Sequence, residues 1–189
     1  MHSREKMYSD VMMAGFGGQG ILLIGNLLAE AALLEEYEVT YLPSYGVEMR
    51  GGTANCTVVI SDTEIGSPQV SAPEVMLVMS QAAAERFEPN VKPNGLLIAN
   101  STLVEVGKFS RKDLEMVCLP FNKIATEMGN SRFANMVALG AYLGKRPLVK
   151  LESIGQVLKE NLTGKKAEFI PMNMKAIEKG IELVSKSGG

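Results

Sequence analysis

A glycine-rich segment near the N-terminus contains the first residues whose types and spacing could do chemistry. Gly15, Gly17 and Gly20 match the pattern G-x-G-x-x-G, with a strand-like apolar segment before them and an apolar helical segment after them. Glycines let backbone N–H groups approach a phosphate, and the positive end of a helix dipole favours an anion. A tight strand-to-helix turn that only packs would use the same glycines. Both interpretations stay open, and the candidates for a phosphate-facing loop are Gly15, Gly17, Gly18, Gln19 and Gly20.

The segment that follows lacks the residue that a dinucleotide site needs. Such a site uses an Asp or Glu at the end of the second strand to bind the ribose hydroxyls, or an Arg to bind a 2′-phosphate. After the predicted strand 39–42 the chain has Pro43 and Ser44, and the nearest arginine, Arg50, lies in a separate loop. We therefore do not expect independent NAD(P) binding. A free-standing Rossmann-like reductase that binds NAD(P) or flavin is the first alternative function.

The second candidate is a polar, glycine-framed loop that follows this strand. In extended chain Glu48 and Arg50 project from the same side, with Met49 opposite. One interpretation is a solvated hairpin with a weak surface ion pair. The other is an interface or ligand loop, because glycines let the backbone lie close to another surface and Tyr, Met and Arg are enriched at interfaces. The candidates for a composite-site or interface loop are Tyr45, Gly46, Glu48, Met49, Arg50, Gly51 and Gly52.

The other reactive side chains are too few for metal or nucleophilic chemistry. An iron–sulfur cluster usually takes four thiolates and a structural zinc ion four Cys or His ligands, whereas this chain has two Cys and one His. The histidine, His2, lies at the terminus, where a general base is poorly positioned. We therefore expect no catalytic residue and no metal site in this chain. Cys56 and Cys118 lie in apolar segments and are predicted to be buried, reduced thiols.

Composition limits the class of protein. A chain of 189 residues that is 46% hydrophobic is long enough for one compact domain, which we expect to span residues 1–189. The net charge is −2 and basic residues form no cluster larger than a pair such as Lys165-Lys166, so no nucleic-acid partner is expected. No segment approaches the roughly 18 apolar residues of a membrane helix, and the N-terminus lacks a signal-peptide core. We expect a cytoplasmic protein without a membrane partner.

Hydrophobic periodicity predicts the elements that position these loops. A three-layer α/β/α Rossmann-like domain with a mainly parallel sheet is expected from alternating strand and helix patterns. Pro43 is predicted to end the second strand, and Glu64-Ile65 to pair back with the third as an antiparallel hairpin. The C-terminal third is helical, with Gly140 and Gly144 allowing another backbone to come close. The predicted strands are 10–15, 39–42, 55–60, 75–79, 96–99 and 115–119, and the predicted helices are 21–32, 81–87, 122–128, 133–141, 151–162 and 174–184.

Taken together, the two glycine-containing segments resemble the gamma subunit, or gamma domain, of 2-oxoacid:ferredoxin oxidoreductases. The resemblance rests on residues 15–20 and 45–52 together with the strand 54–61. It extends through residues 65–68 and the order of the later elements, and it is least distinctive in the helical C-terminus. Because no ferredoxin module is fused to the chain, it resembles the stand-alone gamma chain of the 2-oxoglutarate or pyruvate type.

The resemblance implies a subunit of an enzyme that converts a 2-oxoacid and coenzyme A to acyl-CoA and carbon dioxide while reducing ferredoxin. It implies alpha, beta and ferredoxin-like delta subunits as partners. Thiamine diphosphate would lie between alpha and beta, and iron–sulfur clusters in the beta and ferredoxin-like parts. No cofactor is expected on this chain alone, which would be inactive and able to form a homodimer when isolated. A non-enzymatic binding module is the second alternative function.

Overall fold

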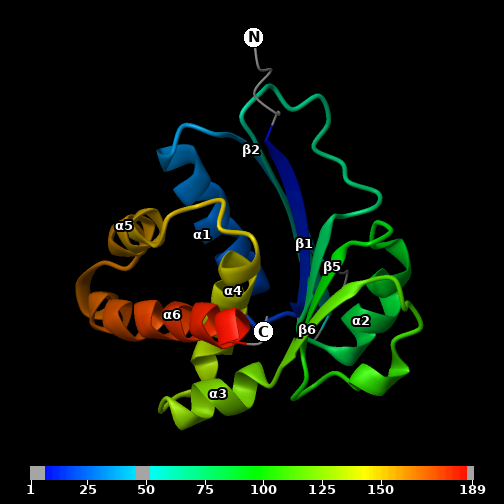
Figure 1. Ribbon diagram of the computed structural model, residues 1–189. Helices are drawn as coiled ribbons and strands as arrows, with labels where there is room; N and C mark the ends of the chain where they lie inside the picture. Colours follow the sequence, from blue (N-terminus) through cyan, green and yellow to red (C-terminus); the bar gives the residue numbers. More distant parts are fainter. Residues whose placement is uncertain (1–6, 46–51, 187–189) are drawn as a thin grey trace.

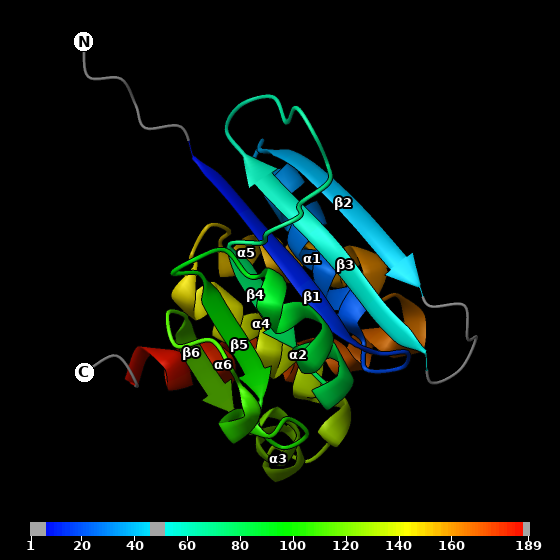
Figure 2. The same cartoon turned by 90° about the vertical axis from the view of Figure 1, so that its right-hand side faces the viewer.

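The computed structural model describes residues 7–45 and 52–186, and its centre is a six-stranded sheet in the order β2-β3-β1-β4-β5-β6 (Figure 2). Strands β1, β4, β5 and β6 are parallel, whereas β3 runs antiparallel to both of its neighbours, β1 and β2. The prediction of a mainly parallel sheet is confirmed. The strands are β1 (Tyr8–Phe16), β2 (Glu38–Tyr45), β3 (Thr53–Ser61), β4 (Val75–Val78), β5 (Leu96–Asn100) and β6 (Glu115–Leu119).

Helices cover both faces of the sheet, so the predicted α/β/α arrangement is also confirmed (Figure 1). One face carries α1 (Ile21–Leu34), α4 (Ala134–Lys145), α5 (Leu151–Asn161) and α6 (Ile170–Lys186). The other face carries α2 (Gln81–Phe87), and α3 (Phe121–Glu127) follows the end of β6. None of the helices in the described ranges is long and apolar enough to cross a membrane. That residues 1–189 form a single domain stays a prediction.

The central strands form because their side chains are buried on both faces. In β1, Val11 and Met13 belong to the core cluster under α1, whereas Ala14 belongs to the cluster under α2. This alternation follows from the two-residue period of a strand. All residues of β4 and β5 are buried, as expected for central parallel strands between two helical layers. The sheet therefore supplies a rigid base for the loops at its edge.

Two details of the predicted strands are wrong. Pro43 does not end β2, which continues to Tyr45, with Pro43 opposite Cys56 in the register. The strand tolerates proline because β2 lies at the edge of the sheet, where an N–H on the open side needs no partner. Glu64-Ile65 does not pair with β3, because both edges of β3 are already occupied by β1 and β2. The antiparallel hairpin is instead β2 with β3.

The thiols differ in their surroundings. Cys56 of β3 is buried, as predicted, but Cys118 of β6 is only half-buried. The difference follows from position, because β3 lies inside the sheet and β6 at its other edge. Both cysteines are free. The prediction of a buried thiol is therefore confirmed for Cys56 and wrong for Cys118.

Candidate functional site

The glycine turn between β1 and α1 needs glycine at two positions. Gly18 and Gly20 have φ angles of 92° and 75°, in the left-handed region that side chains disfavour. The turn closes with a hydrogen bond of 3.1 Å from the Gln19 N–H to the Phe16 carbonyl oxygen. The space beyond Gly18 is open, since no atom lies within 4 Å of the position that a Cβ would take. The turn therefore has an open outer side at Gly18.

The inner side of the turn is occupied by the side chain of Gln19. Its Oε1 accepts a hydrogen bond from the Phe16 N–H at 2.6 Å, and its Nε2 donates to the Met79 carbonyl oxygen at 3.0 Å. The Met79 N–H in turn donates to the Ala14 carbonyl oxygen at 2.8 Å. A Cβ on Gly15 would overlap Gln19 Oε1, so glycine is needed there to make room for the amide. Gln19 thus links the end of β1 to the end of β4.

A buried asparagine from α4 holds the other end of the turn. The Gly20 carbonyl oxygen accepts the first hydrogen bond of α1 from Ile24 N–H at 3.2 Å, and a second from Asn135 Nδ2 at 3.4 Å. A Cβ on Gly20 would overlap Asn135 Nδ2. Asn135 is not among the site residues predicted from the sequence. The only indication in the sequence is a polar residue inside the apolar stripe that begins α4.

The glycine turn also contacts the end of the second candidate loop. The Gly17 N–H donates to the Gly52 carbonyl oxygen at 3.0 Å, which continues the antiparallel pairing of β1 with β3. On the other side of that loop, Tyr45 ends β2 opposite Ala54, with 72% of its surface exposed. The structure therefore brings together the glycine turn and both ends of the second candidate loop, residues 45–52, which we call the charged loop. The candidates between those ends, Gly46, Glu48, Met49, Arg50 and Gly51, lie outside the described residues.

The strand order differs from that of a dinucleotide-binding domain. In such a domain the second strand lies parallel to the first and directly beside it, so that its end meets the ribose. Here β3 lies between β1 and β2 and is antiparallel to both. Pro43 and Ser44 are therefore one strand further from the glycine turn than a ribose-binding residue would be. This geometry argues against the NAD(P)-binding alternative.

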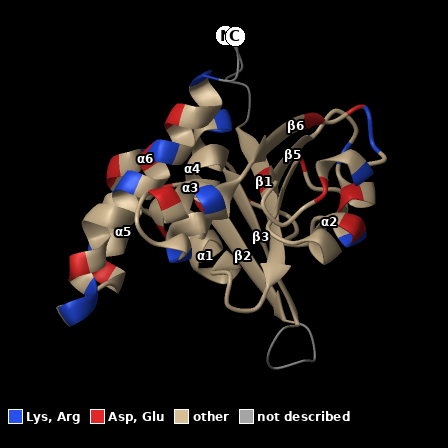
Figure 3. Ribbon diagram, turned by 90° about the horizontal axis from the view of Figure 1, so that it is seen from below, with Lys and Arg blue, Asp and Glu red and all other residues tan. Residues whose placement is uncertain are grey.

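The described part of this corner is nearly uncharged. Figure 3 shows that Lys, Arg, Asp and Glu are concentrated on the helices and around α2, whereas the strands carry few. Strand β3 has no charged residue, and β2 has only Glu38, at the end away from the loop. Along β2 and β3 lies a cavity of about 450 Å³, whose hydroxyl and amide groups can bind uncharged polar atoms. It is lined by Met12, Leu42, Ser44, Asn55, Thr57, Ser67, Gln69, Val70 and Ser71.

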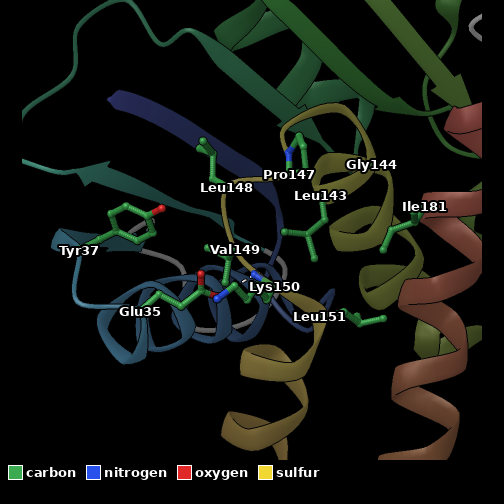
Figure 4. Close-up of a pocket in the computed structure, with 10 residues that line it drawn as sticks. All are labelled: Glu35, Tyr37, Leu143, Gly144, Pro147, Leu148, Val149, Lys150, Leu151 and Ile181. Carbon is green, nitrogen blue, oxygen red and sulfur yellow. Dashed lines mark hydrogen bonds between the residues drawn. The ribbon is translucent and has the colours of Figure 1, made fainter. Parts of the chain in front are cut away.

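A second cavity, of about 500 Å³, lies at the opposite end of α1 and is mostly apolar (Figure 4). Its carboxylate, Glu35, accepts hydrogen bonds from the Lys150 N–H at 2.6 Å and from Ser153 Oγ at 2.7 Å, at the start of α5. Glu35 therefore stabilises the helix N-terminus. Because α1 has 14 residues, this cavity is about 20 Å from the glycine turn and is not part of the same site.

The described residues do not form a metal or cluster site. Within residues 7–45 and 52–186, no three His, Cys, Asp or Glu side chains are close enough together to hold a metal ion. Burial raises the pKa of the Cys56 thiol to about 12, and its Sγ donates to the Ile21 carbonyl oxygen at 3.7 Å. Cys118 lies on β6, at the far edge of the sheet. The two thiols do not fit the ligand set of an iron–sulfur cluster.

Comparison with known proteins matches most of the chain to one family. The family model described as "Pyruvate ferredoxin/flavodoxin oxidoreductase" matches residues 10–183. The chain is similar to the ketoisovalerate oxidoreductase subunit VorA of Methanothermobacter thermautotrophicus, with 38% identity over 174 residues. That match covers 91% of this chain but only 35% of VorA, so the chain spans about a third of the length of this relative.

Two further proteins match along nearly their whole length. The 2-oxoglutarate synthase subunit KorC of Methanocaldococcus jannaschii is 34% identical over 185 residues, which are 97% of each chain. The crystal structure of the keto/oxoacid ferredoxin oxidoreductase gamma subunit from Geobacter sulfurreducens superposes with a TM-score of 0.79 at 28% identity. That superposition covers 94% of this chain and 99% of the other.

Proposed function

The chain belongs to the pyruvate ferredoxin/flavodoxin oxidoreductase family, and from this premise we propose that it is the gamma subunit of a 2-oxoacid:ferredoxin oxidoreductase. In the proposed reaction a 2-oxoacid, coenzyme A and oxidised ferredoxin become acyl-CoA, carbon dioxide and reduced ferredoxin. One observation carries the proposal beyond family membership. The hydrogen bond from Gly17 to Gly52 joins the glycine turn to the charged loop at one corner of the sheet.

The charged loop, residues 45–52, is proposed to enter a composite active site formed with partner subunits. Arg50 would complement the negative charge of an anionic substrate, and Glu48 would orient that arginine. Two observations support this role. Tyr45, at the start of the loop, is largely exposed, and the neighbouring ends of β1, β2 and β3 carry no charge of their own.

The glycine turn is proposed to face the same composite site with its outer side. Gly18 is open to solvent there, and α1 begins directly after the turn, so the helix dipole favours an anion. The phosphates of coenzyme A are the anion that we propose. The N–H groups of Phe16, Gly17 and Gln19 already have partners within the chain, which limits such contacts to the side of Gly18 and the first turn of α1. Direct packing against a neighbouring subunit is the other outcome to be tested.

The proposed cofactors belong to the partners. Thiamine diphosphate and the iron–sulfur clusters would be held by the alpha, beta and ferredoxin-like delta subunits, and ferredoxin would bind to the assembled complex. Two free thiols on well-separated strands are consistent with that assignment, and with the proposed cytoplasmic location. The isolated chain is proposed to be inactive and to form a homodimer when its partners are absent.

The proposal is tested by purifying the complex anaerobically with a tag on this chain. We expect the partner subunits and thiamine diphosphate to co-purify, and 2-oxoacid- and coenzyme A-dependent reduction of ferredoxin or a dye. The assay compares 2-oxoglutarate, pyruvate and 2-oxoisovalerate, because relatives named for 2-oxoglutarate and for ketoisovalerate are both similar to the chain. A tagged chain that purifies without partners, or turns over a substrate with its own nucleotide, would contradict the proposed function.

Replacement of Arg50 tests the role of the loop within that complex. Loss of one charge-assisted hydrogen bond removes about 1.5–3 kcal/mol, so we expect Arg50→Ala to lower kcat/KM about tenfold or more. Arg86→Ala is the matched control, because it also removes one arginine, but from α2, where the Arg86 side chain lies over the Phe87 ring. An Arg50→Ala complex with wild-type assembly and turnover would rule out this role.

A further inference from the structure

Gln19 lies between the ends of two neighbouring strands, β1 and β4, whose following helices cover opposite faces of the sheet. After β1 the chain passes to α1 on one face of the sheet, and after β4 it passes to α2 on the other face. In open α/β sheets such a switch point at the carboxyl ends of the strands is where ligands bind. In this protein the side chain of Gln19 lies at that point and bonds to Phe16 on one side and to Met79 on the other.

These two hydrogen bonds engage both ends of the Gln19 amide. The amide oxygen faces the Phe16 N–H at 2.6 Å, and the amide nitrogen faces the Met79 carbonyl oxygen at 3.0 Å. An apolar side chain of similar size would leave both backbone groups without these partners. Gly15 is matched to this arrangement, because a side chain there would overlap Gln19 Oε1. We call these three contacts, made by Gln19 with Phe16, Met79 and Gly15, the glutamine clasp.

The glutamine clasp is continuous with the end of the charged loop. Phe16, which the clasp fixes, is followed by Gly17, whose N–H donates to the Gly52 carbonyl oxygen at 3.0 Å. Gly52 directly precedes β3, so its position sets where the chain enters this strand. At the other end of the turn, Asn135 fixes Gly20 from α4. The turn is therefore held at Phe16 and at Gly20. Gly17, which lies between these two residues, binds Gly52.

We propose that Gln19 is a positioning residue for the glycine turn where it faces the composite site, a role that rests on the proposed function. By locking the glycine turn to the end of β4, Gln19 fixes Gly17 and, through it, Gly52. The open side of the turn at Gly18 and the start of β3 are then held in a fixed arrangement toward the partner subunit. Gln19 itself touches neither substrate nor cofactor in this role.

Three variants test the role in the assembled complex. Gln19→Leu removes both hydrogen bonds. Gln19→Glu keeps the acceptor for the Phe16 N–H but, when ionised, sets an oxygen against the Met79 carbonyl. Gly15→Ala displaces the amide without altering Gln19. Gly107→Ala is the matched control, because no atom lies within 4 Å of its added Cβ.

We expect Gln19→Leu and Gly15→Ala to assemble and to lower kcat/KM about tenfold or more, because small errors in positioning are costly in catalysis. Their effects should not be additive in the double variant, since both break the same clasp. For Gln19→Glu, activity relative to wild type should recover as the pH falls, because a protonated carboxyl group can again donate to Met79. A residue that only stabilises the fold would lower the melting temperature without changing kcat/KM or its pH profile.

Hydrogen exchange of the full chain separates this role from the proposed function. Faster exchange of the Phe16 and Gly17 amides is expected in Gln19→Leu, and exchange at the wild-type rate would overturn the clasp. Faster exchange with unchanged kcat/KM would overturn the positioning role alone. A wild-type complex without 2-oxoacid-dependent turnover would instead overturn the proposed function, and with it the positioning role, while the exchange rates would still show whether the clasp exists.

Discussion

Neutral amide side chains build the carboxyl edge of this sheet. Besides Gln19 and Asn135, the fully buried Asn100 accepts hydrogen bonds from the Phe121 N–H at 3.1 Å and the Thr102 N–H at 3.3 Å. Its Nδ2 donates to Asn122 Oδ1 at 2.7 Å. An amide supplies both a donor and an acceptor without the cost of burying a charge. The edge is therefore held by neutral hydrogen bonds, and the proposed charges come from the loop that contains Glu48 and Arg50.

The different burial of the two thiols gives a prediction for single residues. With a pKa of about 12, Cys56 is almost entirely protonated at pH 8, and it is also buried, so it should resist a thiol reagent. Cys118 is half-buried and should react first. Mass spectrometry after timed alkylation should show one modification on Cys118 in the native chain and a second only after denaturation. The variant Cys118→Ser is the control, and its rapid native alkylation at Cys56 would contradict the prediction.

At the scale of elements, the packing of α4 against α6 depends on missing side chains. A Cβ on Gly140 would overlap the Ile177 carbonyl oxygen, and one on Gly180 would overlap the Val137 carbonyl oxygen. The helix backbones therefore touch directly, which confirms the prediction that another backbone could come close at Gly140. This contact fixes the position of α4 on the face of the sheet. Helix α4 contains Asn135, which donates a hydrogen bond to the glycine turn. Helix packing and the candidate site are thus connected.

A pair of glycine variants tests this helix contact. Gly140→Ala forces the helices apart, and we expect it to lower the free energy of unfolding by about 1–3 kcal/mol. Gly155→Ala in α5 is the matched control, since the nearest atoms are the flexible Met174 Cε at 3.4 Å and Sδ at 3.6 Å. Because alanine favours a helix over glycine by up to about 1 kcal/mol, the control should be neutral or stabilising. Equal urea denaturation midpoints for the two variants would contradict the close packing.

At the scale of the whole molecule, the asymmetry of the sheet separates two regions. Strands β1, β4, β5 and β6 form a parallel half covered on both faces, and β3 with β2 forms an antiparallel extension. The described residues on either side of the candidate loop, Tyr45 and Gly52, lie at the end of this extension. The charged residues are concentrated on the helices and around α2, and β2 and β3 carry few (Figure 3). The described part of this corner is nearly uncharged, which suits contact with a partner subunit.

The same asymmetry predicts how the isolated chain responds to nucleotides. A ligand at a hundred times its dissociation constant would stabilise the fold by about 2.7 kcal/mol, which a melting curve detects readily. Because β3 separates β1 from β2, we expect no rise in melting temperature with NADH, NADPH or FAD at millimolar concentration. AMP is the control for weak adenine binding. A rise with NADPH that AMP does not produce would restore the reductase alternative.

The sequence by itself determined the elements and the two candidate segments. Local patterns carry that information, because a strand repeats every two residues, a helix every 3.6, and left-handed turns select glycine. Helix α2 and strand β6 have the predicted bounds, and Gly18 and Gly20 have the positive φ angles that glycine permits. The resemblance to the gamma subunit also rests on short segments that can be identified before any fold is known.

Only the tertiary structure decided which of these segments meet. The insertion of β3 between β1 and β2, the continuation of β2 through Pro43, and the contact of Asn135 with Gly20 all depend on residues far apart in the chain. Periodicity describes which side of an element is buried but not which element covers it. For the same reason, the glycine spacing left open whether the turn binds a phosphate or only packs. In the structure the amide of Gln19 fills the inner side of the turn, because its partner Met79 is brought close only when β4 pairs with β1.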